Sequence, residues 1–223
     1  MHNYLKQNER LDDLQINNLF IIQDPKGYCF TSDAVQLANF VRCKKGDNVV
    51  DLCSGSGVIG ILINAKNNLN KVWLVEIQSK LADMSERSIK LNGLEEKIEV
   101  INKPLQNISS ILTGNRIDCV VCNPPYKKQN TAKLLNESEE KSIARHEIMV
   151  TLRDIVKEAS LLLKFGGRFN TIIKEERLIE LINYCSEFGI EVKRIKILKS
   201  VKGANAVMVE GIKGGKSGCS VEI

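Results

Sequence analysis

The sequence predicts one α/β domain in which helices cover both faces of a mainly parallel sheet. From Asp47 onward, short apolar runs alternate with segments of helical periodicity, and this alternation is typical of parallel strands joined by crossover helices. A glycine-rich loop at residues 54–57 follows the first of these runs and precedes a helical segment. We therefore expect one domain over residues 31–223, with residues 1–30 as an N-terminal extension packed on its core.

The first expected elements lie in and just after the extension. Residues 24–27 read Asp-Pro-Lys-Gly, a turn-forming sequence, and a short strand is expected on either side of them. A helix is expected over residues 31–41, with Ser32 or Asp33 as its N-cap, because short polar side chains accept hydrogen bonds from a helix's first free N–H groups.

The remaining elements alternate between strand and helix. Strands are predicted at residues 48–53, 71–77, 97–102, 117–123, 168–173, 190–198 and 205–212, and helices at residues 58–66, 78–92, 151–165 and 175–188. Gly93 suits the left-handed position past a helix end; Thr151 is expected to cap the third of these helices, and Gly166 with Gly167 to end it. Residues 127–150 lack periodicity, as functional loops of that length do.

The composition is that of an ordinary globular protein with a mild basic excess. The formal net charge is +5 and the isoelectric point is about 8.8, a balance that permits a nucleic-acid partner without requiring one. No apolar stretch approaches the roughly 20 residues that span a bilayer, and residues 1–13 are too polar for a secretion signal. We therefore expect a cytoplasmic protein without a membrane partner.

The chain has seven cysteines, an odd number that indicates free thiols in a reducing compartment. Cys119 and Cys122 have the spacing of a redox or zinc pair, but a second such pair is missing. Residues three apart in a strand face opposite sides of the sheet. We therefore expect both cysteines to be core residues, and we expect no metal site.

Gly55, Gly57 and Gly60 follow the G-x-G-x-x-G pattern of nucleotide-binding loops, between a predicted strand and a helix. Glu76 ends the next strand, 21 residues after Gly55, where an acidic side chain binds ribose hydroxyls. These features indicate a nucleoside-containing cofactor, and an NAD-dependent dehydrogenase is one interpretation.

Asp51 favours a different cofactor. It lies at the end of the first of these strands, four residues before Gly55, where its charge would repel a pyrophosphate. S-adenosylmethionine (SAM) has no phosphates and carries a sulfonium, an amino group and a ribose. Asp51 would hold its amino end, directly or through water, and Glu76 would accept its ribose hydroxyls. The alternative is that Asp51 only caps the loop or the helix that follows.

The tetrapeptide Asn123-Pro124-Pro125-Tyr126 follows the fourth predicted strand, at the edge where open α/β sheets bind ligands. A planar amino group, as on adenine, attacks a methyl group poorly because its lone pair is delocalised. The side-chain carbonyl of Asn123 and the backbone carbonyl of Pro124 would accept its two N–H hydrogens and favour the developing positive charge. Proline pre-organises these acceptors, and Tyr126 would stack on the base. Taken alone, the tetrapeptide also fits an ordinary strand-ending turn.

These motifs resemble those of a known family. The stretches DLCSGSG (51–57), EIQ (76–78) and NPPY (123–126) are similar to those of class I SAM-dependent methyltransferases that act on amino nitrogens. The segments FTSDAVQLANF, VEIQSKLADMSERSIKLN, IARHEIMVTLRD and ANAVMVEGIKGGKSG more closely resemble bacterial tRNA methyltransferases that modify N6 of adenine 37 in a valine tRNA. The likeness covers residues 15–218 or nearly so.

The resemblance implies a Rossmann-like sheet of seven strands, mainly parallel with the last strand antiparallel. It implies that the cofactor is bound by Thr31, Ser32, Asp33, Asp51, Cys53, Gly55, Gly57, Glu76, Ile77 and Asn123, the first three closing over its methionine part. It also implies that Asn123, Pro124, Pro125 and Tyr126 hold the target adenine. Many relatives contact the cofactor adenine with an acidic residue where this chain has Lys103 and Pro104, so we expect backbone groups and apolar contacts to hold that ring instead.

Two groups of basic residues are candidates for binding RNA. Lys127 and Lys128 follow Tyr126, and Arg145 and His146 lie at the far end of the same loop. Between residues 191 and 216 there are seven Lys or Arg against two acidic residues. From this segment we expect five residues to contact RNA phosphates, namely Lys193, Arg194, Lys196, Lys199 and Lys202.

The leading prediction is a SAM-dependent methyltransferase that modifies N6 of an adenine in tRNA, at adenine 37 of a valine tRNA. The alternative within the same chemistry is an N-methyltransferase of a protein glutamine side chain or of another RNA or DNA base. A dehydrogenase and a non-catalytic RNA-binding domain are the alternatives from other classes.

Overall fold

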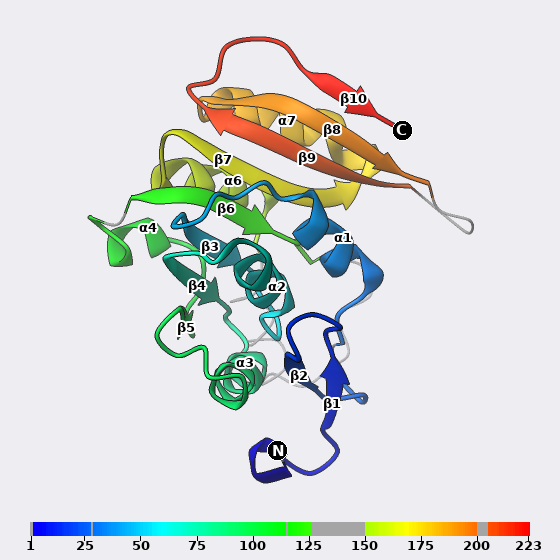
Figure 1. Ribbon diagram of the computed structural model, residues 1–223. Helices are drawn as coiled ribbons and strands as arrows, with labels where there is room; N and C mark the ends of the chain where they lie inside the picture. The colour runs from blue at the N-terminus through cyan, green and yellow to red at the C-terminus, as the bar shows by residue number, and fades with distance from the viewer. Residues whose placement is uncertain (1, 28, 115, 126–149, 200–204) are drawn as a thin grey trace, which may run out of the picture.

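The computed structural model describes residues 2–27, 29–114, 116–125, 150–199 and 205–223. These residues form an eight-stranded sheet in the order β10-β8-β9-β7-β6-β3-β4-β5 (Figure 1). Its strands are β3 (Asn48–Leu52), β4 (Lys71–Val75), β5 (Ile98–Ile101), β6 (Ile117–Cys122), β7 (Leu163–Lys174), β8 (Ile190–Leu198), β9 (Ala206–Lys213) and β10 (Ser220–Glu222).

Seven of these strands confirm the predicted sheet. β9, the last of the seven, is antiparallel to its neighbours β7 and β8, and the other pairs of strands are parallel. β10 is an addition that the sequence did not predict: three residues near the C-terminus pair in parallel with β8 at the edge of the sheet.

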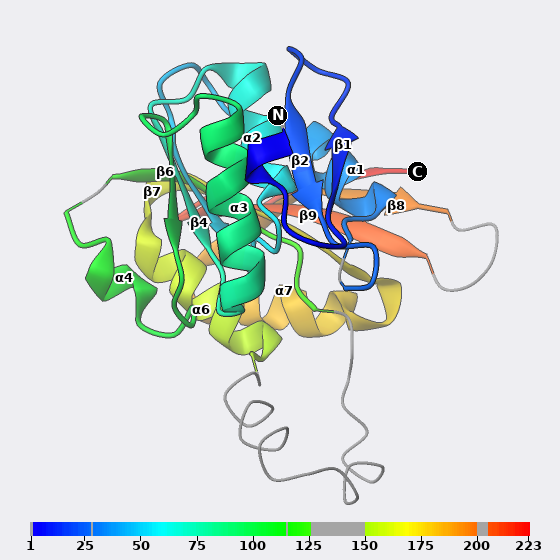
Figure 2. The same cartoon turned by 90° about the horizontal axis from the view of Figure 1, so that it is seen from below.

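Helices cover both faces of the sheet, as predicted (Figures 1 and 2). Side chains alternate between the faces along each strand, so Val49 and Val50 belong to different core clusters. The cluster around Val49 includes residues of α1 (Ser32–Phe40), α2 (Val58–Asn67) and α3 (Ser79–Leu91). The cluster around Val50 includes residues of α4 (Ile108–Ile111), α6 (Leu152–Leu162) and α7 (Leu178–Glu187), the last preceded by the short 3-10 helix η3 (Glu175–Arg177).

The N-terminal elements pack against α3. They are the 3-10 helix η1 (His2–Tyr4) and an antiparallel pair, β1 (Arg10–Asp13) and β2 (Phe20–Gln23). The backbone N–H of Ile22 donates to Ser88 Oγ at 2.9 Å, and that of Phe20 donates to Asn92 Oδ1 at 3.0 Å. Ser88 of α3 and Asn92, the C-cap of α3, therefore accept hydrogen bonds from backbone N–H groups that the edge strand β2 would otherwise leave free.

The turn at residues 24–27 and the strand before it are confirmed, but the strand predicted after the turn is wrong. The Gly27 N–H donates to the Asp24 carbonyl at 2.9 Å. β2 precedes the turn and pairs with β1 upstream, whereas the described residues Cys29 and Phe30 form no strand. The reason is that the Phe30 N–H donates to the side chain of Gln23 at 3.1 Å and not to a neighbouring strand.

The predicted ends of two helices also need correction. α1 begins at Ser32, so its N-cap is Thr31, which makes no side-chain capping bond among the described residues. Thr151 does cap α6, through a reciprocal capping box with Asp154. α6 ends at Leu162, however, and the glycines predicted to end it lie inside β7.

Pairing with β6 explains why β7 begins so early. Leu163 is buried and pairs with Ile117, and the next aligned pair is Cys119 with Arg168. One residue of β6 therefore lies opposite residues 164–167, and Gly166, with a φ of 77°, makes this irregularity possible. Tertiary pairing converts the last turn of the predicted helix into strand.

Candidate active site

Three parallel strands end together at the edge of the sheet that carries the candidate site. Leu52 of β3 is aligned with Val75 of β4 on one side and with Cys122 of β6 on the other. The next residue on each strand is Cys53, Glu76 or Asn123. The alignment therefore brings the glycine loop, the acidic residue and the Asn-Pro-Pro sequence to one place, as the sequence predicted.

The glycine loop packs too closely on β4 for larger residues. A Cβ atom on Gly57 would lie 2.7 Å from Leu74 Cδ1, and one on Gly60 would lie 2.4 Å from Leu74 Cδ2. Gly57 also has a φ of 85°, in the left-handed region that favours glycine. These glycines therefore let the start of α2 pack closely against β4.

Asp51 is fully buried beneath this loop, and its two carboxylate oxygens differ in their contacts. Oδ2 accepts a hydrogen bond from the Gly60 N–H at 3.0 Å, which is the capping role considered for this residue. Oδ1 has no hydrogen-bond partner within the described part of the chain. Burial, together with the nearby charge of Glu76, raises the pKa of Asp51 from 3.8 to about 8.

Glu76 is 5% exposed and organises the loop from the end of β4. Its Oε2 accepts from the Gly55 N–H and its Oε1 from the Gln78 N–H, both at 2.8 Å. Burial raises the pKa of Glu76 in spite of these bonds. Each carboxylate oxygen keeps a second lone pair, so the side chain retains acceptors for ribose hydroxyls.

Asn102 is a residue of this region that the sequence analysis missed. Its Nδ2 donates to the carbonyls of Glu76 at 2.8 Å and Ile77 at 3.1 Å, and its Oδ1 accepts from Ser79 Oγ at 2.9 Å. It therefore fixes the chain that carries Glu76 and Ile77. The neighbouring Lys103 is exposed. Asparagine after a short strand is common in turns, so no local signal marked Asn102.

Asn123 follows β6, and its side-chain oxygen is a hydrogen-bond acceptor. Oδ1 is buried and has no hydrogen-bond partner among residues 2–27, 29–114, 116–125, 150–199 and 205–223. Pro124 is buried and Pro125 exposed. Tyr126 lies outside the described residues. Asp51 Oδ1, Ser54 Oγ and Asn123 Oδ1 are three of the seven buried side-chain atoms that lack partners in the described part of the protein, and all three belong to this strand edge.

Gln23 connects the N-terminal strands to the glycine loop and was not predicted. Its Nε2 donates to Ser56 Oγ at 3.0 Å, and its Oε1 accepts from the Phe30 N–H at 3.1 Å. This bridge places the chain before Thr31 next to the loop. Thr31 and Ser32 are exposed and Asp33 is half-buried at the start of α1. The cofactor-binding role predicted for these three residues remains a prediction.

The cysteines lie in the core on opposite faces, as predicted. Cys119 and Cys122 are both fully buried, in different core clusters. Burial and contact with the Cys53 thiol raise the pKa of Cys122 well above its ordinary value. Cys53 has a φ of 58° and is half-buried at the start of the glycine loop. Cys122 therefore has Cys53 as its thiol neighbour, and Cys119 lies on the other face of the sheet.

The predicted RNA-binding residues fall into different environments. Lys199 is exposed and Lys196 half-buried. Lys193 donates to the carbonyls of residues 216–218, and Arg194 is only 7% exposed and ion-paired with Glu210. Arg194 is thus interior and does not belong to an exposed basic face. The predictions for Lys127, Lys128, Arg145, His146 and Lys202 lie outside the described residues.

The residues of the site fit SAM better than a dinucleotide. The loop covers a buried carboxylate with a free oxygen, and Glu76 lies beside it. Acceptors attract a ligand that carries an ammonium, a sulfonium and hydroxyls, and they repel a pyrophosphate. In the described residues, no group of three or more His, Cys, Asp or Glu could hold a metal ion, and no helix is long and apolar enough to cross a membrane.

Comparisons with known proteins agree with this chemistry. The tRNA1(Val) (adenine(37)-N6)-methyltransferase of Shewanella frigidimarina is 23% identical over 189 residues, covering 82% of this chain and 74% of that protein. The release factor glutamine methyltransferase of Mycoplasma mycoides subsp. mycoides is 29% identical over 183 residues, covering 71% of this chain and 59% of that protein.

Solved structures share the fold. TrmN from Thermus thermophilus has a TM-score of 0.59 and 18% identity, covering 80% of this chain and 48% of that chain. M. jannaschii TYW2, solved in complex with AdoMet, has a TM-score of 0.64 and 14% identity, covering 94% of this chain and 89% of that chain.

The family itself follows from a direct match over most of the chain. The model of the methyltransferase small domain family matches residues 33–185, from the start of α1 into α7, and so includes the glycine loop, Glu76 and Asn123. The chain belongs to the methyltransferase small domain family, and its methyl donor is S-adenosylmethionine.

Proposed function

We propose that this methyltransferase transfers the methyl group of SAM to the N6 amino group of an adenine in tRNA, at adenine 37 of a valine tRNA. The observation that carries the proposal is the buried Asn123 Oδ1, which has no partner in the described part of the chain. An unpartnered buried acceptor is costly, and a substrate N–H group would satisfy it.

Asn123 and Pro124 hold the reacting amino group in this proposal. Asn123 Oδ1 accepts one N–H hydrogen and the Pro124 carbonyl accepts the other, so the nitrogen is oriented toward the methyl group. The two acceptors stabilise the positive charge that develops on the nitrogen, and they need no reorganisation because proline restricts the backbone. The methylated amine then loses its proton to water. Pro125 shapes the turn, and Tyr126 stacks on the base.

The cofactor is held by the glycine loop and its acidic neighbours. Asp51 Oδ1 takes the amino end, directly or through water, and Glu76 accepts the ribose hydroxyls. The backbone at Cys53, Gly55 and Gly57 allows close approach, and Ile77 contacts the adenine ring. Residues 31–33 close over the methionine part. We further propose that residues 31–223 are the single catalytic domain and that residues 1–30 are an extension packed on it.

Two observations support tRNA as the substrate. Several relatives are named tRNA1(Val) (adenine(37)-N6)-methyltransferase, at 21–23% identity. Lys199 is exposed directly after β8. Because β8 runs in the same direction as β6, its carboxyl end and that of β6 lie on the same side of the sheet. An anticodon loop already presents exposed bases, so extruding an adenine from it costs less than from a duplex.

The test is to incubate the protein with labelled SAM and valine tRNA, and to locate the label by nuclease digestion and mass spectrometry. N6-methyladenine at position 37 is the expected product. Valine tRNA from a strain lacking the gene is the matched substrate. If that tRNA still carries N6-methyladenine at a normal level, the specific substrate is refuted.

The second candidate substrate is a glutamine side chain in a protein. The observation that favours it is the relative of 29% identity, which is named release factor glutamine methyltransferase. A glutamine amide is planar and carries two N–H hydrogens, so Asn123 and Pro124 would hold it in the same way. Label from SAM that enters a protein extract but not total RNA would establish this alternative.

A further inference from the structure

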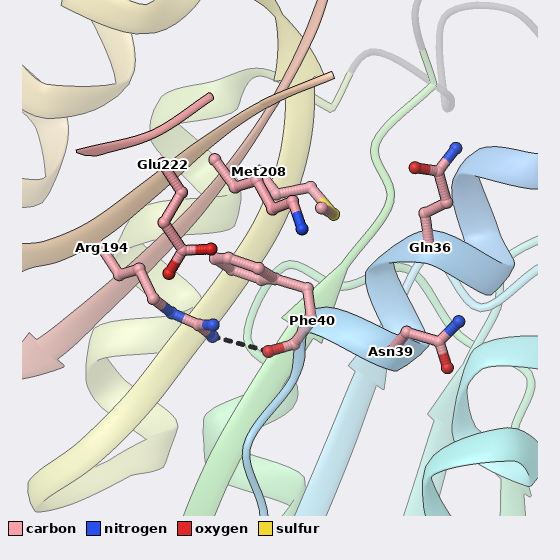
Figure 3. Close-up of a pocket in the computed structure, with 7 residues that line it drawn as sticks. Gln36, Asn39, Phe40, Arg194, Met208 and Glu222 are labelled. Atoms are coloured by element: carbon pink, nitrogen blue, oxygen red, sulfur yellow. Dashed lines mark hydrogen bonds between the residues drawn. The ribbon is translucent and has the colours of Figure 1, made fainter. Parts of the chain in front are cut away.

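A pocket separate from the strand edge lies between α1 and the outer strands of the sheet (Figure 3). Its volume is about 270 Å³, and it is lined by Gln36, Asn39, Phe40, Arg194, Lys196, Met208 and Glu222. The first three residues belong to α1 and the others to β8, β9 and β10. None of the cofactor-binding or amino-group-binding residues above lines it.

The floor of the pocket is a cross-strand row. Lys196 of β8 is aligned with Met208 of β9 on one side and with Glu222 of β10 on the other. Aligned residues on neighbouring strands point to the same face of a sheet. The row therefore presents a thioether, an ammonium and a carboxylate side by side, and its last member comes from the added C-terminal strand.

One wall of the pocket is the Arg194 side chain, which its contacts hold in place, and another is formed by side chains of α1. The Arg194 guanidinium lies 3.7 Å from the centre of the Phe40 ring, and its Nη2 donates to the Phe40 carbonyl at 2.6 Å and to Glu210 Oε2 at 3.3 Å. Arg194 Nε is buried without a partner among the described residues. Gln36 adds an amide group from α1, whereas the side-chain oxygen of Asn39 accepts a hydrogen bond from Lys66 of α2 and its amide points away from Phe40 and Met208 in Figure 3.

The pocket lies close to the strand edge that carries the active site. β6 and β9 are separated by β7 alone, and neighbouring strands lie about 4.8 Å apart, so Met208 is about 10 Å from the end of β6 across the sheet. Stacked nucleotides rise about 3.4 Å each, so this distance corresponds to about three nucleotides. α1 begins at Ser32 and ends at Phe40, so it runs from the residues predicted to close over the cofactor to the wall of the pocket.

We propose that this pocket binds one nucleotide of the substrate RNA, close to the methylated adenine in the same single-stranded loop. Met208 contacts the face of the base. Gln36 reads its edge, and Lys196 binds a phosphate. Glu222 accepts from an exocyclic amino group, so the pocket takes a base that carries one, such as cytosine or adenine, rather than uracil. The inference rests on the RNA substrate proposed above and adds where a second base is read.

The chemistry of the lining favours a nucleotide over a peptide. An amide for the base edge, a cation for a phosphate and a thioether for the face of the base correspond to the parts of one nucleotide. The Glu222 carboxylate lies near both Lys196 and the Arg194 guanidinium, and it keeps lone pairs that accept from a base amino group. Glu222 is therefore the residue that makes the pocket selective.

The test measures the affinity of the whole protein for a labelled RNA hairpin that carries the anticodon loop of valine tRNA. Gln36→Ala and Lys196→Ala are each expected to weaken binding about tenfold. Lys196→Ala is also expected to reduce the dependence of the affinity on salt concentration by the equivalent of about one phosphate contact. Asn183→Ala and Lys157→Ala are the matched controls, since both residues are exposed on helices of the opposite face.

A second measurement addresses the role of Glu222. The unaltered protein is expected to bind hairpins with cytosine or adenine at one position near the target more tightly than hairpins with uracil there. Glu222→Gln is expected to lose this preference. Calorimetry with SAM is expected to give the same affinity for every variant, which excludes misfolding as the cause.

The outcomes separate this proposal from the proposed function. If the unaltered protein binds and methylates the hairpin, and the Gln36 and Lys196 variants bind as tightly as the two controls, the pocket proposal is overturned and the RNA substrate stands. If the unaltered protein methylates a protein extract and neither binds nor methylates RNA, both are overturned.

Discussion

Asn123 and Asp51 each carry one buried oxygen that has no partner in the described residues. Asp51 lies near the end of β3 and Asn123 directly after β6, and the two strands end at the same edge of the sheet. Burying either oxygen without a hydrogen bond costs free energy unless a ligand donates to it. At the scale of single residues, the site is therefore prepared for donors: an amino group at Asn123 and a cationic group at Asp51.

Asn123→Ala is expected to lower the rate of methyl transfer about 10²- to 10³-fold, because it removes one of two acceptors that stabilise the developing charge. The affinity for SAM should fall much less than the rate. Asn183→Ala, at an exposed position of α7, is the control. Single-turnover kinetics and calorimetry give the two quantities. A variant that loses cofactor binding in proportion to rate would contradict the assigned role.

Asp51 should make both stability and cofactor binding depend on pH. Its pKa rises from 3.8 to about 8 in the folded protein, so between these values the folded state holds a proton that the unfolded chain releases. The free energy of unfolding therefore falls as pH rises through this window. A cationic ligand favours the ionised carboxylate, so SAM binding at neutral pH should release a proton.

Asp51→Asn is expected to remove this proton release and this part of the pH dependence of stability. Calorimetry in buffers of different ionisation enthalpy measures the proton released on binding, and urea unfolding from pH 5 to 9 measures stability. Equal proton release from the Asn variant and the unaltered protein would show that another group titrates.

At the scale of elements, the start of α2 depends on glycine at position 60. Alanine there would gain about 1 kcal/mol of helix propensity. Its Cβ, however, would lie 2.4 Å from Leu74 Cδ2 and 3.1 Å from Val72 Cγ1, and both side chains are fully buried. Overpacking of this kind costs about 1–3 kcal/mol and would move the loop away from Asp51.

Gly60→Ala is therefore expected to lower both the free energy of unfolding and the affinity for SAM. Gly27→Ala is the matched control, because its Cβ would meet atoms only at 3.6 Å and beyond. Urea unfolding and calorimetry measure the two effects. If the two variants are equally stable, α2 has room to shift and the packing argument does not hold.

At the scale of the whole molecule, Arg87 of α3 joins the N-terminal extension to the sheet domain. Its Nη1 donates to the Tyr4 carbonyl at 2.5 Å and to Glu9 Oε2 at 2.6 Å, and its Nη2 donates to Asp83 Oδ2 at 2.7 Å. The Glu9 side chain is nearly buried in this ion pair. Breaking such a pair by removing one partner leaves an uncompensated charge.

Arg87→Met is expected to release the extension at a cost of about 3 kcal/mol. Faster amide hydrogen exchange in β1 and β2, with unchanged exchange in β6 and β7, is the expected result. Arg177→Met is the control, since its pair with Glu180 lies within one turn of chain. The domain boundary near residue 30 would be wrong if exchange rose equally in the extension and the main sheet.

Local patterns in the sequence predicted much of the fold and the outline of the site. Alternating apolar runs indicated the seven strands, and G-x-G-x-x-G, Glu76 and the Asn-Pro-Pro sequence marked three strand ends. Each signal lies within a few neighbouring residues, because backbone propensity and side-chain periodicity act over that range.

Only the tertiary structure decided several other features. β7 begins at Leu163 because Ile117 pairs with it, β2 pairs upstream with β1, and Arg194 is buried under Phe40 and Glu210. Gln23 and Asn102 support the site through contacts with chain 33 and 26 residues away. Pairing, burial and such contacts join residues distant in sequence, so no local pattern specifies them, whereas the strand ends and their polar residues were specified by the sequence alone.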